Sequence, residues 1–170
     1  MKPWGTWADV VTALRLPLAA LFPFAHGPAA QLAIVGVAAV SDFVDGMLAR
    51  RVGASRVGVV LDPVADKVFA ATAFLTVASR GILTWYEVAG VLLRDILAVL
   101  GFFGTWLLRR PVALPARAGG KAVTVAQILT LIAYGAGSPL VRPLAWATAA
   151  IGVYATWDYG RAAARLAADR

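Results

Sequence analysis

The sequence predicts an all-α, polytopic membrane protein with six transmembrane helices, and three observations lead to this prediction. Hydrophobic residues make up 61% of the 170-residue chain, against about 45–50% in soluble domains. Charged residues make up 15%, against about 25% in soluble domains, and the mean hydropathy is +0.76. A soluble chain this short could not bury so much apolar surface, so the bilayer must be its solvent.

The apolar residues fall in runs of about 20, the length of helix that crosses roughly 30 Å of hydrocarbon. We expect spans at roughly 6–25, 30–49, 62–79, 84–108, 121–137 and 140–160. Helix-breaking residues separate them, namely His26-Gly27-Pro28, Gly81, Pro111 with Pro115, and Gly137-Ser138-Pro139. There is no internal repeat, so residues 1–170 are predicted to form one integral-membrane domain.

The distribution of basic residues predicts the orientation. Six spans place both termini and the 50–61 and 109–120 loops on one face. That face would carry eleven basic residues, Lys2, Arg50, Arg51, Arg56, Arg109, Arg110, Arg117, Lys121, Arg161, Arg165 and Arg170. The opposite face would carry only Arg80 and Arg142. The positive-inside rule therefore places the 50–61 loop in the cytoplasm. We expect a multi-pass protein of a prokaryotic cell (inner) membrane, with its active site facing the cytoplasm.

Charge and cysteine content exclude several classes of function. The net charge of +7 does not indicate a nucleic-acid partner, because the basic residues flank apolar runs instead of forming one patch with interleaved aromatic residues. Cysteine is absent, so neither disulfides nor thiolate chemistry is available. Asp9 and Arg15 interrupt the first apolar stretch, which is therefore expected to be a retained span and not a cleaved signal peptide.

Four aspartates form a pattern that is unusual in apolar helices. Asp42 and Asp45 stand at i and i+3 near the end of the second span, and Asp62 and Asp66 at i and i+4 near the start of the third. Each pair shares one helix face. A carboxylate in the membrane interior costs about 2.5–3.5 kcal/mol, and Arg50 and Lys67 leave two negative charges unbalanced.

Bound cations would resolve this excess of charge. Oxygen ligands without His or Cys select Mg²⁺, Mn²⁺ or Ca²⁺, and four carboxylates suffice for two ions. Two such ions beside Gly46, Ala49, Arg50 and Gly58 suit chemistry on a pyrophosphate, with small residues admitting a nucleotide and Arg50 binding phosphate. The alternatives are a structural salt-bridge network, helix packing by the small residues, and a snorkelling Arg50.

The spacing resembles the signature of the CDP-alcohol phosphatidyltransferases, D-x2-D-G-x2-A-R followed after a short gap by G-x3-D-x3-D. All eight positions are present, at Asp42, Asp45, Gly46, Ala49, Arg50, Gly58, Asp62 and Asp66. The family's six-helix fold also matches the predicted spans. Thr12 and Arg15 are similar to the family's opening N-x-x-T-x-x-R element, although Asp9 stands where Asn is usual.

This resemblance implies transfer of a phosphatidyl group from CDP-diacylglycerol to an alcohol, with release of CMP. It implies that Asp42, Asp45, Asp62 and Asp66 bind two Mg²⁺ or Mn²⁺ ions and that Asp66 is the catalytic base. Gly46, Ala49, Arg50 and Gly58 would contact the cytidine diphosphate. The expected partners are the liponucleotide, the alcohol and membrane lipids, and the family suggests a homodimer.

The acceptor alcohol is less well defined. Leu61–Lys67 and the Gly120-Lys121-x-x-Thr124-x-x-Gln127 segment resemble the branches that use glycerol-based acceptors. These are phosphatidylglycerophosphate synthase, which uses glycerol 3-phosphate, and cardiolipin synthase, which uses phosphatidylglycerol. Inositol phosphate is a further alternative. Because each of these acceptors carries a phosphate, Arg94 and Lys121 are candidate acceptor-binding cations.

Two other classes of function fit the sequence less well. A cation transporter would use the carboxylates as a transit site, but transporters usually have repeated halves and a site near the midplane, whereas these aspartates lie near one face. A catalytically silent lipid-binding or assembly protein would have no need of all eight signature residues. The sequence therefore favours an enzyme.

Overall fold

The computed structural model describes residues 7–52, 58–107 and 118–168, and every regular element in these ranges is helical. The elements are α1 (Trp7–Ala13), α2 (Arg15–Leu21), a 3-10 helix η1 (Phe22–Phe24), α3 (Pro28–Val52), α4 (Gly58–Ser79), α5 (Trp85–Leu107), α6 (Ala118–Gly135) and α7 (Val141–Ala168). The all-helical prediction is confirmed. Each expected span corresponds to one of these helices, except that the first is divided into α1, α2 and η1.

Proline explains this division. Pro17 has no N–H to donate to the carbonyl of Ala13, which is the last residue of α1. Helical hydrogen bonds continue on both sides of the break, from Leu14 N to Val10 O at 3.2 Å and from Leu18 N to Leu14 O at 3.3 Å. The segment therefore keeps one direction through α1 and α2.

Glycines with positive φ end two of the long helices. Gly81 has φ 74° and Gly137 has φ 64°. After α4, Gly81 N donates to Ala78 O and Ile82 N to Val77 O, which is the hydrogen-bond pattern of a Schellman motif. After α6, Gly137 N and Ser138 N repeat the same pattern. These turns lie where the sequence predicts breaks between spans.

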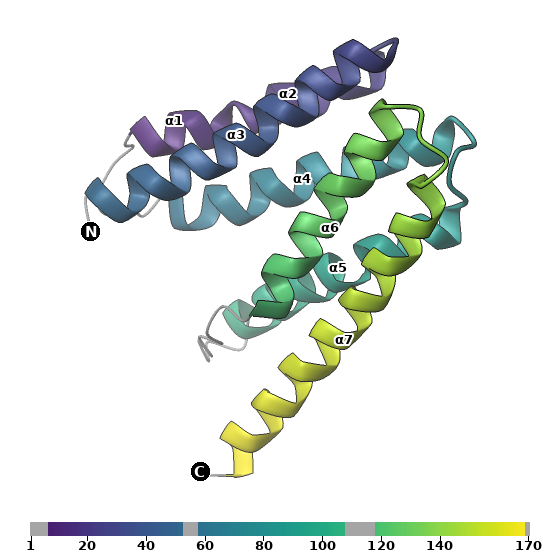
Figure 1. Ribbon diagram of the computed structural model, residues 1–170. Helices are drawn as coiled ribbons and strands as arrows, with labels where there is room; N and C mark the ends of the chain where they lie inside the picture. The colour runs from purple at the N-terminus through teal and green to yellow at the C-terminus, as the bar shows by residue number, and fades with distance from the viewer. Residues whose placement is uncertain (1–6, 53–57, 108–117, 169–170) are drawn as a thin grey trace. The chain divides into compact units, whose positions relative to one another are not determined.

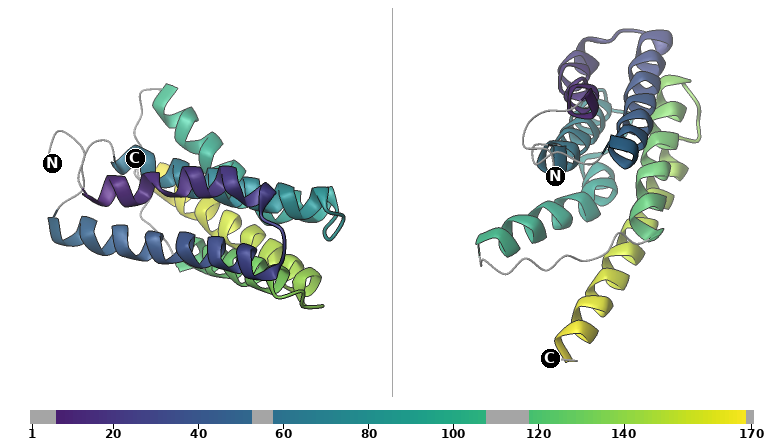
Figure 2. Two further views of the ribbon diagram at one scale, coloured as in Figure 1. Left: turned by 90° about the horizontal axis from the view of Figure 1, so that it is seen from above. Right: turned by 90° about the vertical axis from the view of Figure 1, so that its left-hand side faces the viewer.

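The described residues fall into two compact units. The first contains residues up to Ile82 together with Leu131–Pro139. Within it, α1 packs on α3 and α4, and α2 packs on α4. The α1–α2 segment lies alongside α3 and runs in the opposite direction (Figure 1), and Figure 2 shows this pair from two further sides.

The core of the first unit is built mainly on one face of α4. Ala65, Phe69, Ala73, Phe74 and Val77 are buried there. The ring of Phe22 meets that of Phe69 edge to face, with 6.1 Å between ring centroids. Near the end of α4, the Arg80 guanidinium donates to the hydroxyl of Tyr134 and to the carbonyls of Pro23 and Ala25, at 2.7–2.9 Å.

The second unit contains Leu83–Thr130 and the chain from Leu140 onward, and α5 packs along α7. Small residues allow close helix contact, because a Cβ on Gly90 would lie 3.2 Å from the Cβ of Ala149. Glu87 caps the start of α5 by accepting hydrogen bonds from the backbone N–H and the hydroxyl of Thr84.

One segment of the described chain, Pro28–Met47 in α3, is by length and composition apolar enough to cross a membrane, with a mean hydropathy of 1.4. Other long helices carry several charged side chains, such as Asp62, Asp66 and Lys67 in α4. Six membrane crossings therefore remain a prediction, as does a single integral-membrane domain over residues 1–170.

Candidate active site

The four signature aspartates lie on two helices of the first unit. Asp42 and Asp45 are in the second half of α3, and Asp62 and Asp66 are in the first turns of α4. The α1 helix contacts both α3 and α4. The side chains of the α1–α2 segment are therefore able to meet aspartates from both helices.

Arg15, the first residue of α2, lies among three of these carboxylates. Its Nη1 is 3.2 Å from Asp42 Oδ1, and its Nη2 pairs with Asp45 Oδ2 and lies 3.7 Å from Asp62 Oδ1. The side chains of Arg15 and Asp45 are 2% and 3% exposed, whereas those of Asp42 and Asp62 are about half exposed. The structure thus gathers Asp42, Asp45 and Asp62 around one buried cation.

Thr12 joins the same cluster from α1. Its hydroxyl oxygen lies 2.7 Å from both Asp45 Oδ2 and Asp62 Oδ1. A hydroxyl has one proton and donates to one acceptor at a time. Together Thr12 and Arg15 link the aspartates of α3 to those of α4.

Asp66 has a different partner. Its Oδ2 lies 3.1 Å from Nζ of Lys67, and its side chain is 32% exposed. No ion pair between Asp66 and Arg15 occurs in the described residues. Three of the four predicted metal ligands therefore share a cation, and the fourth lies one helical turn after Asp62 on the same helix.

The predicted nucleotide-binding residues belong to the same two helices. Gly46 directly follows Asp45 on α3, and Gly58 begins α4. The backbones of Ala49 and Arg50 continue α3. Their side chains lie outside the described residues, so their predicted contacts with a cytidine diphosphate remain predictions.

The carboxylates suit a hard divalent cation in donor chemistry and in charge, since three of them converge on a single cationic group. Their spacing is set by Arg15 and Thr12. Within the described residues, no three His, Cys, Asp or Glu side chains are arranged so as to hold a metal ion. Ions that bind to the carboxylate oxygens held by Arg15 would compete with its guanidinium.

Arg15 also has atoms without a hydrogen-bond partner. Its Nε and Nη1 are buried and form no hydrogen bond with the described residues. The 3.2 Å approach of Nη1 to Asp42 is an ion pair without hydrogen-bond geometry. A buried guanidinium with unsatisfied donors is held less firmly than one whose donors are all paired.

The contribution of Thr12 and Arg15 was not predicted from the sequence, which assigned Arg50 and Lys67 as the nearby cations. The sequence did contain a signal for it. Arg15 interrupts an apolar stretch, and a charged residue at such a position needs a partner. Asp9, in the same segment, is also buried, with 8% of its surface exposed.

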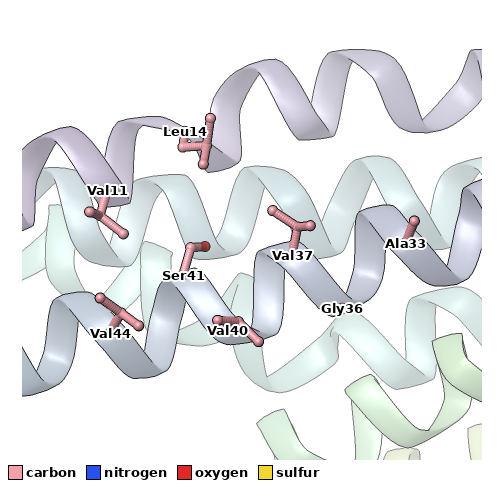
Figure 3. A pocket seen from close by; sticks show the side chains of 8 residues that line it. All are labelled: Val11, Leu14, Ala33, Gly36, Val37, Val40, Ser41 and Val44. Carbon is pink, nitrogen blue, oxygen red and sulfur yellow. The ribbon is translucent and has the colours of Figure 1, made fainter.

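An apolar groove begins beside the aspartates. It has a volume of about 520 Å³ and lies between the α1–α2 segment and α3 (Figure 3). Its lining residues are Val11, Leu14, Ala33, Gly36, Val37, Val40, Ser41 and Val44. The six from α3 form one stripe along the helix, and Ser41 and Val44 directly precede Asp42 and Asp45.

The candidate acceptor-binding residues lie in the second unit. Arg94 is on α5, where its Nη1 lies 3.0 Å from Asp95 Oδ1, and its side chain is 18% exposed. Lys121 is exposed in the first turn of α6. The structure thus places Arg94 beside Asp95, a carboxylate that balances its charge within an apolar helix.

The described chain is all-helical, and its carboxylate cluster lies where α1 and α2 meet α3 and α4. The sequence profile of the CDP-alcohol phosphatidyltransferase family matches residues 5–157, which is most of the chain. The chain belongs to this family, and the resemblance seen in its signature is confirmed.

Several bacterial relatives are similar over much of the chain. A Mycobacterium tuberculosis protein named a probable phosphatidylglycerophosphate synthase is 32% identical over 138 residues, which are 73% of this chain and 63% of that protein. A Sodalis glossinidius CDP-diacylglycerol–glycerol-3-phosphate 3-phosphatidyltransferase is 33% identical over 75% of this chain and 73% of its own. A Mycobacterium bovis protein, named provisionally as a cardiolipin synthase, is 33% identical over 70% of this chain and 59% of that protein. The match to the M. tuberculosis protein thus spans less than two thirds of that relative's length.

Proposed function

We propose that this protein transfers a phosphatidyl group from CDP-diacylglycerol to glycerol 3-phosphate and releases CMP. The observation that carries the proposal is the convergence of Asp42, Asp45 and Asp62 on one buried cation. These carboxylates belong to the pattern that resembles the family signature, and they lie within the matched residues 5–157. The names of the M. tuberculosis and S. glossinidius relatives support glycerol 3-phosphate as the acceptor.

The proposed site requires Mg²⁺ or Mn²⁺, with Asp42, Asp45, Asp62 and Asp66 as the residues that would hold two ions. When bound, such ions would neutralise the pyrophosphate oxygens and stabilise CMP as it leaves. Gly46, Ala49, Arg50 and Gly58 are proposed to bind the cytidine diphosphate, because they follow or precede the aspartates on the same two helices.

Asp66 is the proposed catalytic base. It takes the proton of the acceptor hydroxyl as the acceptor oxygen bonds to the phosphorus that carries diacylglycerol. The bond between that phosphorus and the bridging oxygen of the pyrophosphate breaks, and this oxygen leaves with CMP. The ammonium of Lys67 lies 3.1 Å from Asp66 Oδ2.

The groove of Figure 3 suits an acyl chain of the liponucleotide. Its lining is apolar except for the Ser41 hydroxyl, and it extends along α3 from the signature aspartates. A lipid whose pyrophosphate lies at Asp42 and Asp45 could place one chain against Val40, Val37 and Gly36. The same groove would have no evident use in an enzyme with a wholly water-soluble donor.

We also propose that the protein crosses the inner membrane six times with the aspartate cluster near the cytoplasmic face. Every described α-helix exposes large apolar side chains, including Phe43 at 66% and Leu100 at 61%. Such surfaces are rare on monomeric soluble proteins. A homodimer, which the family suggests, would cover part of this surface.

The proposal is tested by offering CDP-diacylglycerol and Mg²⁺ to the purified protein with glycerol 3-phosphate, phosphatidylglycerol, inositol phosphate or serine. We expect CMP release with glycerol 3-phosphate and formation of phosphatidylglycerophosphate. Chelation of divalent ions should stop the reaction, and added Mg²⁺ or Mn²⁺ should restore it. CMP release that continues at the same rate after chelation of divalent ions would refute the metal-dependent mechanism.

Cardiolipin synthesis is the second candidate, because the M. bovis relative is named for that activity. It uses the same liponucleotide with phosphatidylglycerol as the acceptor. In the same experiment, cardiolipin formed from phosphatidylglycerol, with no product from glycerol 3-phosphate, would select this candidate.

A further inference from the structure

A short hydrogen-bond chain fixes one edge of the Arg94 guanidinium. Asp95 is 5% exposed, and its Oδ1 accepts the bond from Arg94 Nη1 at 3.0 Å. The other oxygen, Oδ2, accepts a bond from Nε2 of Gln127 at 2.6 Å. Gln127 is itself anchored, because Nε2 also lies 3.3 Å from the carbonyl of Val91. The position of Arg94 on α5 is therefore tied to a buried amide on α6.

The Nη2 side of the Arg94 guanidinium lies against Gly120. A Cβ added at Gly120 would lie 2.5 Å from Nη2 of Arg94 and 3.4 Å from both Cζ of Arg94 and the hydroxyl oxygen of Tyr159. Real Cβ atoms do not approach other heavy atoms as closely as 2.5 Å. The guanidinium therefore occupies space that only glycine leaves against the backbone of α6.

The charges around this guanidinium suit an anion. Asp95 balances one positive charge, and the residue after Gly120 is the exposed Lys121, which adds a second cation to the same turn of α6. A planar guanidinium held in a fixed orientation matches two oxygens of a phosphate better than a mobile one does. Pre-organisation lowers the entropy lost when the anion binds.

We propose that Gly120 and Gln127 are positioning residues that hold the Arg94 guanidinium for the phosphate of the acceptor, an inference that rests on the proposed function. Gly120 supplies the space and Gln127 fixes the orientation of Asp95. The ligand class is a small phosphomonoester of a polyol, such as glycerol 3-phosphate. Selectivity for a phosphorylated acceptor thus depends on two residues that need not touch it.

The test compares the variant G120A with a matched control, G152A. In G120A the new methyl group displaces the end of the Arg94 side chain, which is flexible, so the α6 backbone can stay in place. In G152A the new Cβ would lie 3.7 Å from the Cβ of Arg94, an ordinary contact at the base of the same side chain. Both variants add one methyl group next to Arg94, and only G120A moves the guanidinium.

For G120A we expect the KM for glycerol 3-phosphate to rise about ten- to hundredfold, the range for loss of a charge-assisted hydrogen bond. The KM for CDP-diacylglycerol should stay within about twofold of the wild-type value, and G152A should resemble the wild type in both. Q127L should shift the same KM in the same direction. In an R94A background, G120A should have no additional effect, because both changes act through one guanidinium.

Calorimetric titration with glycerol 3-phosphate separates this inference from the proposed function, since binding needs no turnover. Weaker binding to G120A than to G152A supports the inference even where no acceptor yields CMP, and only the proposed function then fails. Equal binding to G120A and G152A overturns the inference. So does a G120A effect that persists in the R94A background, or an equal rise in both KM values.

Discussion

At the scale of single residues, Arg15 is expected to control how tightly the candidate site binds metal ions. Its guanidinium is a cation in contact with the carboxylates proposed to hold metal, so it and the ions compete for the same charges. We expect R15Q to lower the melting temperature of the chelated protein, because breaking a buried ion pair costs about 3–5 kcal/mol. We expect the same variant to bind Mg²⁺ or Mn²⁺ more tightly and to gain more thermal stability from added metal.

Thermal denaturation and calorimetry with and without metal measure both effects. R80Q is the matched control, because Arg80 also bonds three groups in the first unit but contacts none of the aspartates in the described structure. R80Q should lower the melting temperature and leave metal affinity unchanged. An R15Q protein with wild-type metal affinity would show that Arg15 does not compete with metal ions for the aspartates.

Asp66 differs from the other three aspartates in its partner, and its proposed role also differs. D66N keeps the shape of the side chain and removes its capacity to accept a proton. We expect CMP release to fall at least about 100-fold, since general-base catalysis contributes about 10²–10⁴. CDP-diacylglycerol should still bind in the presence of metal, which a filter-binding assay with labelled lipid can measure. Near-wild-type turnover in D66N would show that another group is the base.

At the scale of elements, the groove between the α1–α2 segment and α3 allows a test of lipid recognition. A Cβ at Gly36 would meet no atom within 4 Å, so G36L should fold and fill the groove. We expect a severalfold higher KM for long-chain CDP-diacylglycerol and little change for a short-chain liponucleotide, which buries fewer CH₂ groups. G101L is the control, because Gly101 on α5 is equally open and lies outside the groove. Equal effects of G36L on both lipids would exclude the groove as the acyl site.

Helix type and turns were largely predictable, because apolar runs and glycine or proline breaks are local signals. Helix ends were less so. α3 extends to Val52 through two arginines, because Arg is a good helix former, and α4 begins at Gly58, four residues before the expected start. The helix break near Leu14 is not visible in the hydropathy of the segment. It follows from Pro17, which has no N–H to donate to a helical hydrogen bond.

The candidate site was predictable where its residues share a helix face and unpredictable where partners are far apart in sequence. Asp42 with Asp45, and Asp62 with Asp66, follow from helix periodicity. The Arg15–Asp45 pair and the Gln127–Asp95 bond join residues 30 and 32 positions apart. Such pairs depend on how helices pack, which no local pattern in one sequence specifies.

At the scale of the whole molecule, the orientation prediction depends on where the basic residues lie relative to the apolar helices. Eleven Lys and Arg residues are predicted on the face of the 50–61 and 109–120 loops, against Arg80 and Arg142 on the other. The energetic basis is the positive-inside rule. The proposed reaction fits this orientation, since both CMP and glycerol 3-phosphate are charged and water-soluble and would be exchanged with the cytoplasm.

The absence of cysteine makes this orientation directly testable, because every introduced thiol is the only one in the chain. We expect a membrane-impermeant maleimide to label H26C and I82C, which lie in the predicted outer turns, when applied to the outside of spheroplasts. R56C and R117C should react only after the membrane is opened, because the predicted orientation places positions 56 and 117 on the cytoplasmic side. The unmodified protein gives the background, and activity of each variant confirms its fold. Labelling of R56C in sealed cells would reverse the orientation, and labelling of H26C without I82C would contradict six crossings.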